Sequence, residues 1–70
     1  MNTGRIVRVA GSVVDVRFAR GSLPRIREAL YVDKDGARCV MEVAQHRDAE
    51  TARCIMLTGS EGLRRGMEVT

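Results

Sequence analysis

The stretch GRIVRVAGSVVDVRF (Gly4–Phe18) contains two valine-rich segments separated by one glycine. In the second segment, Val13–Phe18, the even-numbered residues are apolar, and Asp15 and Arg17 lie between them. This period of two is typical of a β-strand with one buried face. The stretch therefore predicts two antiparallel strands, Ile6–Ala10 and Val13–Phe18, joined by a sharp bend.

Short apolar runs separated by turn residues continue to the end of the chain, a pattern that indicates an all-β domain. Further strands are expected at Ala29–Val32, Arg38–His46, Thr51–Leu57 and Met67–Val69. Glycines suited to the turns stand at Gly11, Gly36, Gly62 and Gly66. Six strands in so short a chain favour a small closed antiparallel barrel, because closure removes the exposed edges of the sheet.

The segment RGSLPRIREAL (residues 20–30) has two interpretations. Ser22 is a possible helix cap with Pro24 in the first helical turn, and the leucine and isoleucine spacing is compatible with a helix. Alternatively, a proline turn leads directly into a strand that ends at the hairpin signal DKDG (residues 33–36). The turn is favoured because the segment is short for a helix.

The chain has 70 residues, which corresponds to a single domain, residues 1–70. Its apolar residues are mostly aliphatic or methionine, with one phenylalanine, one tyrosine and no tryptophan. Cys39 and Cys54 lie in predicted strands and have no metal-ligand spacing, so we expect two buried thiols in a reducing compartment. The N-terminal stretch is not expected to be a signal peptide, and no apolar run reaches membrane-spanning length.

Arginine dominates the charge, with a formal net charge of +3 that is concentrated in the first half of the chain. A basic excess of this size is compatible with a solvated surface, with an acidic protein partner or with nucleic acid. Small barrels bind single strands by combining a basic groove with aromatic platforms, but here only Tyr31 is available as a platform. The aromatic content therefore disfavours nucleic-acid binding.

No arrangement of residues indicates catalysis. The glycine-rich GSEGLRRG (residues 59–66) has no lysine, and no Ser or Thr follows its second glycine, as a phosphate-binding loop would require. His46 is expected to be solvated or hydrogen-bonded, and each of the strand carboxylates Asp15 and Glu42 is expected to face solvent or an arginine of a neighbouring strand. We expect no catalytic, nucleotide-binding or metal site.

The order of several motifs is more specific than any single motif. GRIVRVAGSVVDVRF, LPRIREAL, MEVAQH, ARCIML and EGLRRGMEV follow one another with short spacers. This series resembles the N-terminal β-barrel domain of the beta subunit of rotary F-type ATP synthase, over residues 4–69. The G-x-V-V-D-V-x-F core and the E-G-L-x-R-G ending are the most specific parts, and they are more similar to the beta subunit than to the alpha subunit.

The resemblance implies a non-catalytic assembly domain that holds alternating alpha and beta subunits in a hexameric ring. It implies the alpha subunit as partner, no nucleic acid and no direct membrane contact. Mixed charges at such contacts fix register and partner choice. The candidate contact residues are Arg5, Arg8, Asp15, Arg17 and Glu42.

The resemblance also implies that the chain is a fragment of a longer catalytic subunit, whose phosphate loop lies in the next domain. The fragment would bind no cofactor, whereas the parent subunit would use Mg-ATP or Mg-ADP. The parent would belong to a proton- or sodium-translocating ATP synthase of a bacterium, in the cytoplasm and peripheral to the inner (plasma) membrane. The alternative is a free-standing barrel that binds single-stranded nucleic acid or an acidic protein.

Overall fold

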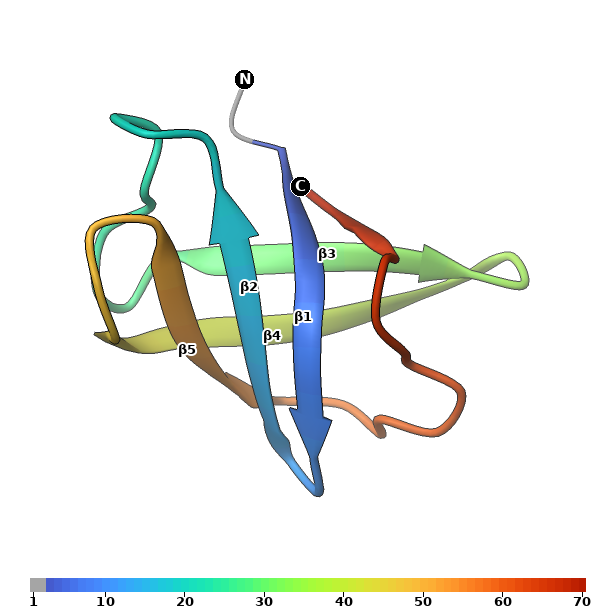
Figure 1. The fold of residues 1–70 in the computed structure, drawn as a ribbon. Helices are drawn as coiled ribbons and strands as arrows, with labels where there is room; N and C mark the ends of the chain where they lie inside the picture. The colour runs from blue at the N-terminus through green and yellow to red at the C-terminus, as the bar shows by residue number, and fades with distance from the viewer. Residues whose placement is uncertain (1–2) are drawn as a thin grey trace.

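The computed structural model describes residues 3–70, so residues 1–2 of the predicted domain lie outside the described part. Within it the sequence forms strands and turns without a helix, and neighbouring strands are antiparallel in the order β3-β4-β5-β2-β1-β6 (Figure 1). The strands are β1 (Gly4–Ala10), β2 (Val13–Phe18), β3 (Ala29–Lys34), β4 (Ala37–His46), β5 (Thr51–Met56) and β6 (Glu68–Val69). The all-β prediction is confirmed, and residues 20–28 form the predicted turn rather than a helix.

The sheet curls until its two edge strands, β3 and β6, come together. The amide of Tyr31 donates a hydrogen bond to the carbonyl of Thr70 (2.8 Å), and the amide of Thr70 donates to the carbonyl of Tyr31 (2.9 Å). In Figure 1, β5, β2 and β1 cross the β3–β4 hairpin steeply. The result is the predicted six-stranded antiparallel barrel, nearly closed, with one residue pair joining its edges.

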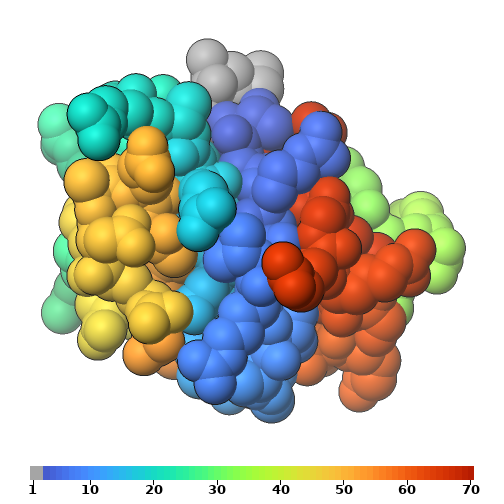
Figure 2. Space-filling model, viewed as in Figure 1, coloured from blue at the N-terminus to red at the C-terminus, as the bar shows by residue number. Residues whose placement is uncertain are grey.

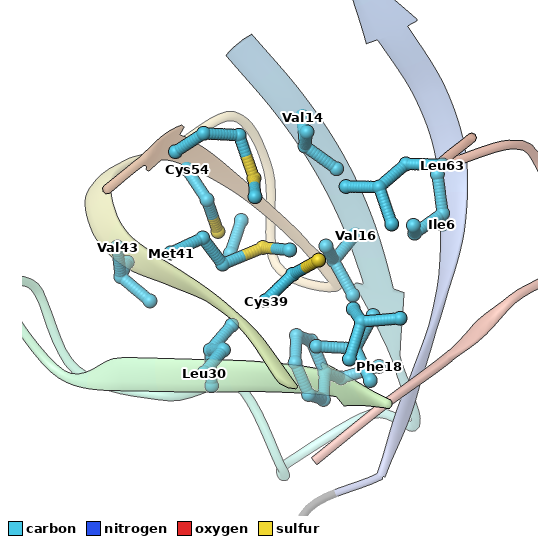
Figure 3. Packing of buried hydrophobic residues seen from close by; sticks show 14 residues of the cluster. Ile6, Val14, Val16, Phe18, Leu30, Cys39, Met41, Val43, Cys54 and Leu63 are labelled. Atoms are coloured by element: carbon cyan, nitrogen blue, oxygen red, sulfur yellow. The ribbon is translucent and has the colours of Figure 1, made fainter. Parts of the chain in front are cut away.

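The core lies inside the barrel and contains the inward residues of every strand (Figure 3). On β2 the predicted inward set is buried, with Val14 and Val16 fully covered and Phe18 3% exposed. The thiols of Cys39 and Cys54 are free and buried, as expected. At Gly4 a β-carbon would lie 2.7 Å from Cγ1 of Val16, so the start of β1 requires glycine for close packing.

Two β-bulges interrupt the alternation of inward and outward residues. On β1 the register shifts between Ile6 and Arg8, and on β4 it shifts between Val43 and Gln45. An inserted residue reverses the face of every residue that follows it. Arg8 and Gln45, which strict alternation would place beside the buried Ile6 and Val43, are therefore exposed on the outside.

The turns have the backbone geometry that their residues favour. The β3–β4 hairpin turns at Asp35 (φ 51°) and Gly36 (φ 80°), a pair of positive φ values typical of a tight two-residue turn. The other three glycines expected at turns also have positive φ values: Gly11 (61°), Gly62 (83°) and Gly66 (91°). β3 reaches Lys34, beyond the predicted end at Val32, because the turn is this short.

Candidate subunit-interface surface

β2 is paired with β1 on one side and with β5 on the other, so the outer faces of these three strands form one continuous surface. Figure 2 shows the molecule from the same side as Figure 1, with the N-terminal segment in blue. Charged side chains meet on the outer surface of the three strands. Asp15 on β2 is paired in register with Arg8 on β1 and with Arg53 on β5. Arg47, which follows β4, also reaches this position. We call Arg8, Asp15, Arg53 and Arg47 the arginine cluster.

Asp15 is the centre of this cluster and is only 1% exposed, although it lies on the outside of the barrel. Arg53 donates two hydrogen bonds to its carboxylate, Nε to Oδ1 (3.0 Å) and Nη2 to Oδ2 (3.3 Å). Arg47 Nη1 donates a third to Oδ2 (3.1 Å). The guanidinium groups thus cover the carboxylate and satisfy it, as a buried charge requires.

The electrostatics follow from these contacts. Burial alone raises the pKa of Asp15, but the hydrogen bonds and charges of Arg53 and then Arg47 outweigh it, so the pKa lies below its ordinary value of 3.8. The bond to Asp15 in turn raises the pKa of Arg53. Asp15 is therefore an ionised, fully engaged group that fixes two arginines, and it is poorly suited to proton transfer.

Arg8 differs from the other two arginines because no described residue forms an ion pair with it. Its side chain lines a shallow depression of about 220 Å³ together with Ala10, Val13, Asp15 and Arg53. The cluster therefore contains three guanidinium groups around one carboxylate, and its excess positive charge faces solvent.

An apolar row adjoins the arginine cluster, one register step along the same strands. Ala10, Val13 and Ile55 are successive register partners across β1, β2 and β5. The side chain of Ile55 is 39% exposed, and the neighbouring Leu57 is 62% exposed. Charged and apolar groups thus lie side by side on one face, a combination typical of protein interfaces.

The structure brings together four of the five residues predicted as contacts. Arg5, Arg8, Asp15 and Arg17 lie on the outer faces of β1 and β2, where Arg5 is directly opposite Arg17. Arg5 Nη1 donates to the carbonyl of Gly66 (3.2 Å). Glu42 lies apart on β4, exposed and opposite Ile55, so it borders the apolar row rather than the arginine cluster.

Sequence reasoning did not identify Arg47, Arg53 and Ile55. Arg53 and Ile55 alternate on β5 with the buried Ala52, Cys54 and Met56, so the period of two could have placed them outside. Arg47 carried no signal, because it lies in a reversal after β4 and its contact with Asp15 spans 32 residues. Each of the two strand carboxylates was expected to face either solvent or an arginine of a neighbouring strand. Asp15 binds an arginine of the neighbouring β5, and Glu42 is exposed to solvent.

Cys54 and His46 are not part of the arginine cluster and have structural surroundings. Burial, with a smaller effect of the Asp15 charge, raises the pKa of Cys54 to about 12, so its thiol is unreactive at neutral pH. The Nε2 atom of His46 lies 2.6 Å from the carbonyl of Pro24 and ties the turn before β3 to the end of β4. Among residues 3–70, no three His, Cys, Asp or Glu residues are grouped so as to hold a metal ion.

The two aromatic rings are also engaged. Phe18 lies in the core, and the half-buried ring of Tyr31 is covered by the guanidinium of Arg38, 5.0 Å from its centroid. Phe18 is therefore inaccessible to a stacking base, and one face of the Tyr31 ring is already occupied by a cation. The described part of the chain has no helix long and apolar enough to cross a membrane.

Comparison with known families gives one match that covers almost the whole chain. The model of the beta-barrel domain of the ATP synthase alpha/beta family matches residues 6–70. The match begins within β1 and includes β2 to β6, so it takes in the arginine cluster and the apolar row.

Proposed function

We propose, for a chain that belongs to the ATP synthase alpha/beta family, a non-catalytic role as an assembly domain of the synthase. In this proposal the chain is the N-terminal barrel of a beta-type subunit. It holds alternating alpha and beta subunits together in a hexameric ring. The residues of the G-x-V-V-D-V-x-F and E-G-L-x-R-G segments favour the beta type.

The observation that carries the proposal is the family match over residues 6–70, together with the outer face of β1, β2 and β5. On that face the arginine cluster has more positive charge than its own carboxylate balances, and an exposed isoleucine lies beside it. A surface of this kind suits a protein partner, because apolar contact supplies affinity and charge supplies specificity.

The same proposal covers the parent protein. The chain would be part of a longer catalytic subunit that binds Mg-ATP or Mg-ADP in a later domain, while the barrel itself binds no cofactor. The complex would translocate protons or sodium ions and would lie in the cytoplasm of a bacterium, peripheral to the inner (plasma) membrane. The barrel would contact neither the membrane nor nucleic acid.

The test is assembly with the partner subunit. The complete native subunit, with and without residues 1–70, would be mixed with the alpha-type subunit of the same organism and examined by native mass spectrometry. We expect an alternating ring with the barrel and isolated subunits without it. Rings of equal stability in both cases would contradict the assembly role.

A second measurement separates assembly from catalysis. Isothermal titration calorimetry of residues 1–70 with Mg-ATP is expected to show no stoichiometric binding. A tight complex with one nucleotide per barrel would contradict the proposal and would indicate a nucleotide site in the barrel itself.

A further inference from the structure

The excess charge of the arginine cluster is the starting point. Asp15 accepts three hydrogen bonds, two from Arg53 and one from Arg47. A guanidinium group carries more N–H donors than these bonds use. Arg8, on the opposite side of Asp15, takes part in none of them. The cluster can therefore accept one more acidic group without losing any bond it already has.

The arginines are also held in place before any partner arrives. Arg53 binds the fixed carboxylate through two nitrogens, which sets the plane of its guanidinium group. The side chains of Arg47 and Arg53 remain 45% and 31% exposed, so the donors not used by Asp15 are accessible. Because these side chains are already ordered, an incoming group meets a smaller entropy cost on binding.

The partner must also cover the apolar row. Ala10 and Val13 line the same depression as Arg8 and Arg53, and Ile55 is the register partner of Val13 on β5. An acidic group in the depression would therefore place its neighbours over Ile55. A free anion such as phosphate would satisfy the arginines but would leave Ile55 exposed. A protein surface with a carboxylate beside aliphatic side chains would bind the arginine cluster and also cover the apolar row.

Two further arginines lie on the same face, directly opposite each other: Arg5 on β1 and Arg17 on β2. Each also has an acidic neighbour, because Glu68 on β6 is opposite Arg5, and Asp48 lines a depression together with Arg17. These neighbours offset part of the charge of the pair, so the arginine cluster supplies the main attraction for an acidic partner. Glu42, at the far border of the apolar row, would disfavour a partner carboxylate there and so would help to fix the register.

We propose that the arginine cluster and the apolar row of Ala10, Val13 and Ile55 together form the docking site for the neighbouring alpha-type barrel. The occupant is a surface segment of that barrel with one Asp or Glu flanked by aliphatic residues. Its carboxylate binds Arg8 and the free donors of Arg53, while its aliphatic side chains cover Ile55. This inference rests on the proposed assembly function and specifies the contact through which assembly occurs.

Charge reversal at Arg8 tests the polar half of the site. The complete subunit carrying Arg8→Glu would be titrated with the alpha-type subunit, and affinity measured by surface plasmon resonance at low and physiological salt. We expect affinity to fall at least about tenfold, with a smaller loss for Arg8→Gln. Arg25→Glu is the matched control, because Arg25 is exposed in the turn before β3 and belongs neither to the arginine cluster nor to the apolar row. Equal losses for Arg8→Glu and Arg25→Glu, or no loss for either, would overturn the docking site.

A photo-crosslinker tests the apolar half and identifies the partner segment. p-Benzoylphenylalanine at position 55 of the complete subunit would be irradiated in the assembled ring, and the linked peptide sequenced by mass spectrometry. We expect a peptide of the alpha-type barrel with an Asp or Glu beside aliphatic residues. Changing that acidic residue to Arg is expected to restore binding of the Arg8→Glu subunit.

The outcomes separate this inference from the proposed function. A ring that assembles normally while position 55 links to nothing, or to a different domain, would overturn the docking site and leave the assembly function intact. If the unmodified subunits form no ring, the assembly function itself fails. Two results together would indicate an anion site instead. Phosphate would protect Arg8 of the unmodified subunit from arginine-modifying reagents, and Arg8→Glu would leave the affinity for the alpha-type subunit unchanged.

Discussion

The barrel has two unequal regions, the ladder of β1, β2 and β5 and the seam where β6 joins β1 to β3. β2 is paired along its whole length, with β1 on one side and β5 on the other. β6 is only two residues long and pairs with β1 at Gly4 and Arg5, while a single residue pair, Tyr31 and Thr70, joins it to β3. The ladder therefore supplies most of the backbone pairing, and the seam completes it.

The two regions are alike in that each contributes a fully buried valine to the core, so they can be compared by the same substitution. Val16 in the ladder and Val69 in the seam are both fully buried. The seam is thus fastened by the buried side chain of Val69 together with a short run of backbone hydrogen bonds. The amide of Ile6 donates to the carbonyl of Met67 (3.0 Å), and the amide of Gly66 donates to the carbonyl of Ile6 (2.8 Å). We infer that the ladder resists unfolding as a unit, whereas the seam opens locally.

The largest effect is expected for Val16→Ala in the ladder. The substitution removes two methyl groups from a site enclosed by paired strands on both sides, so the cavity cannot collapse easily. We expect the free energy of unfolding to fall by about 2 to 3 kcal/mol, measured by urea denaturation. For so small a domain this is a substantial part of the total stability. A loss below that of Val69→Ala would contradict the comparison.

Asp15→Asn tests how far the charged groups on the outer surface of the ladder contribute to the free energy of unfolding. The amide cannot replace the carboxylate toward two guanidinium groups, and we expect a loss of about 1.5 to 3 kcal/mol at neutral pH. Because the pKa of Asp15 is lowered by folding, its stabilising effect is present above pH 3.8 and is lost as the pH falls below that value. Unfolding temperatures of both proteins between pH 2 and 7 should therefore converge in acid.

The control for this prediction is Asp33→Asn. Asp33 also binds an arginine, Arg38 at 3.2 Å, but both side chains are more than half exposed. Exposed ion pairs contribute little to stability. Equal losses for Asp15→Asn and Asp33→Asn would show that the arginine cluster has no special role in the fold.

Val69→Ala makes the same chemical change in the seam and is expected to cost less, about 1 kcal/mol. The short β6 can move toward the core and fill part of the cavity, because only two of its residues are paired in register with β1, whereas β2 is paired along its length on both sides. The same urea titration measures the difference. A cost equal to that of Val16→Ala would show that the seam is as rigid as the ladder.

The smallest expected effect requires no substitution. The amide of Phe18 donates to the carbonyl of Glu50 (2.8 Å) at the end of the ladder, just before β5, and the amide of Tyr31 donates to the carbonyl of Thr70 (2.8 Å) in the seam. Local opening should make the Tyr31 amide exchange with deuterium about tenfold faster or more. NMR-detected exchange measures both amides in one sample, and equal rates would place both regions in one cooperative unit.

Much of the fold was predictable because its signals are local. The alternation in β2 gave the buried face of that strand, and the predicted bounds of Val13–Phe18 are those observed. The bounds at the turns differ by one or two residues, since the hairpin turns at Asp35 and Gly36 and not earlier. Of the candidate site, the sequence indicated the arginines of β1 and β2. The alternation of β5 could also have placed Arg53 on the outer surface, whereas no local pattern predicted the contact of Arg47 with Asp15.

The sequence by itself determined the strand content of this protein, the inward face of β2 and the family to which the motifs are similar. Only the tertiary structure decided the closure at Tyr31 and Thr70, the outward position of Arg8 and the burial of Asp15. The physical reason is that alternation and turn chemistry act between near neighbours in the chain. A bulge, by contrast, depends on the register with a partner strand, and the contacts of Asp15 with Arg47 and Arg53 span 32 and 38 residues.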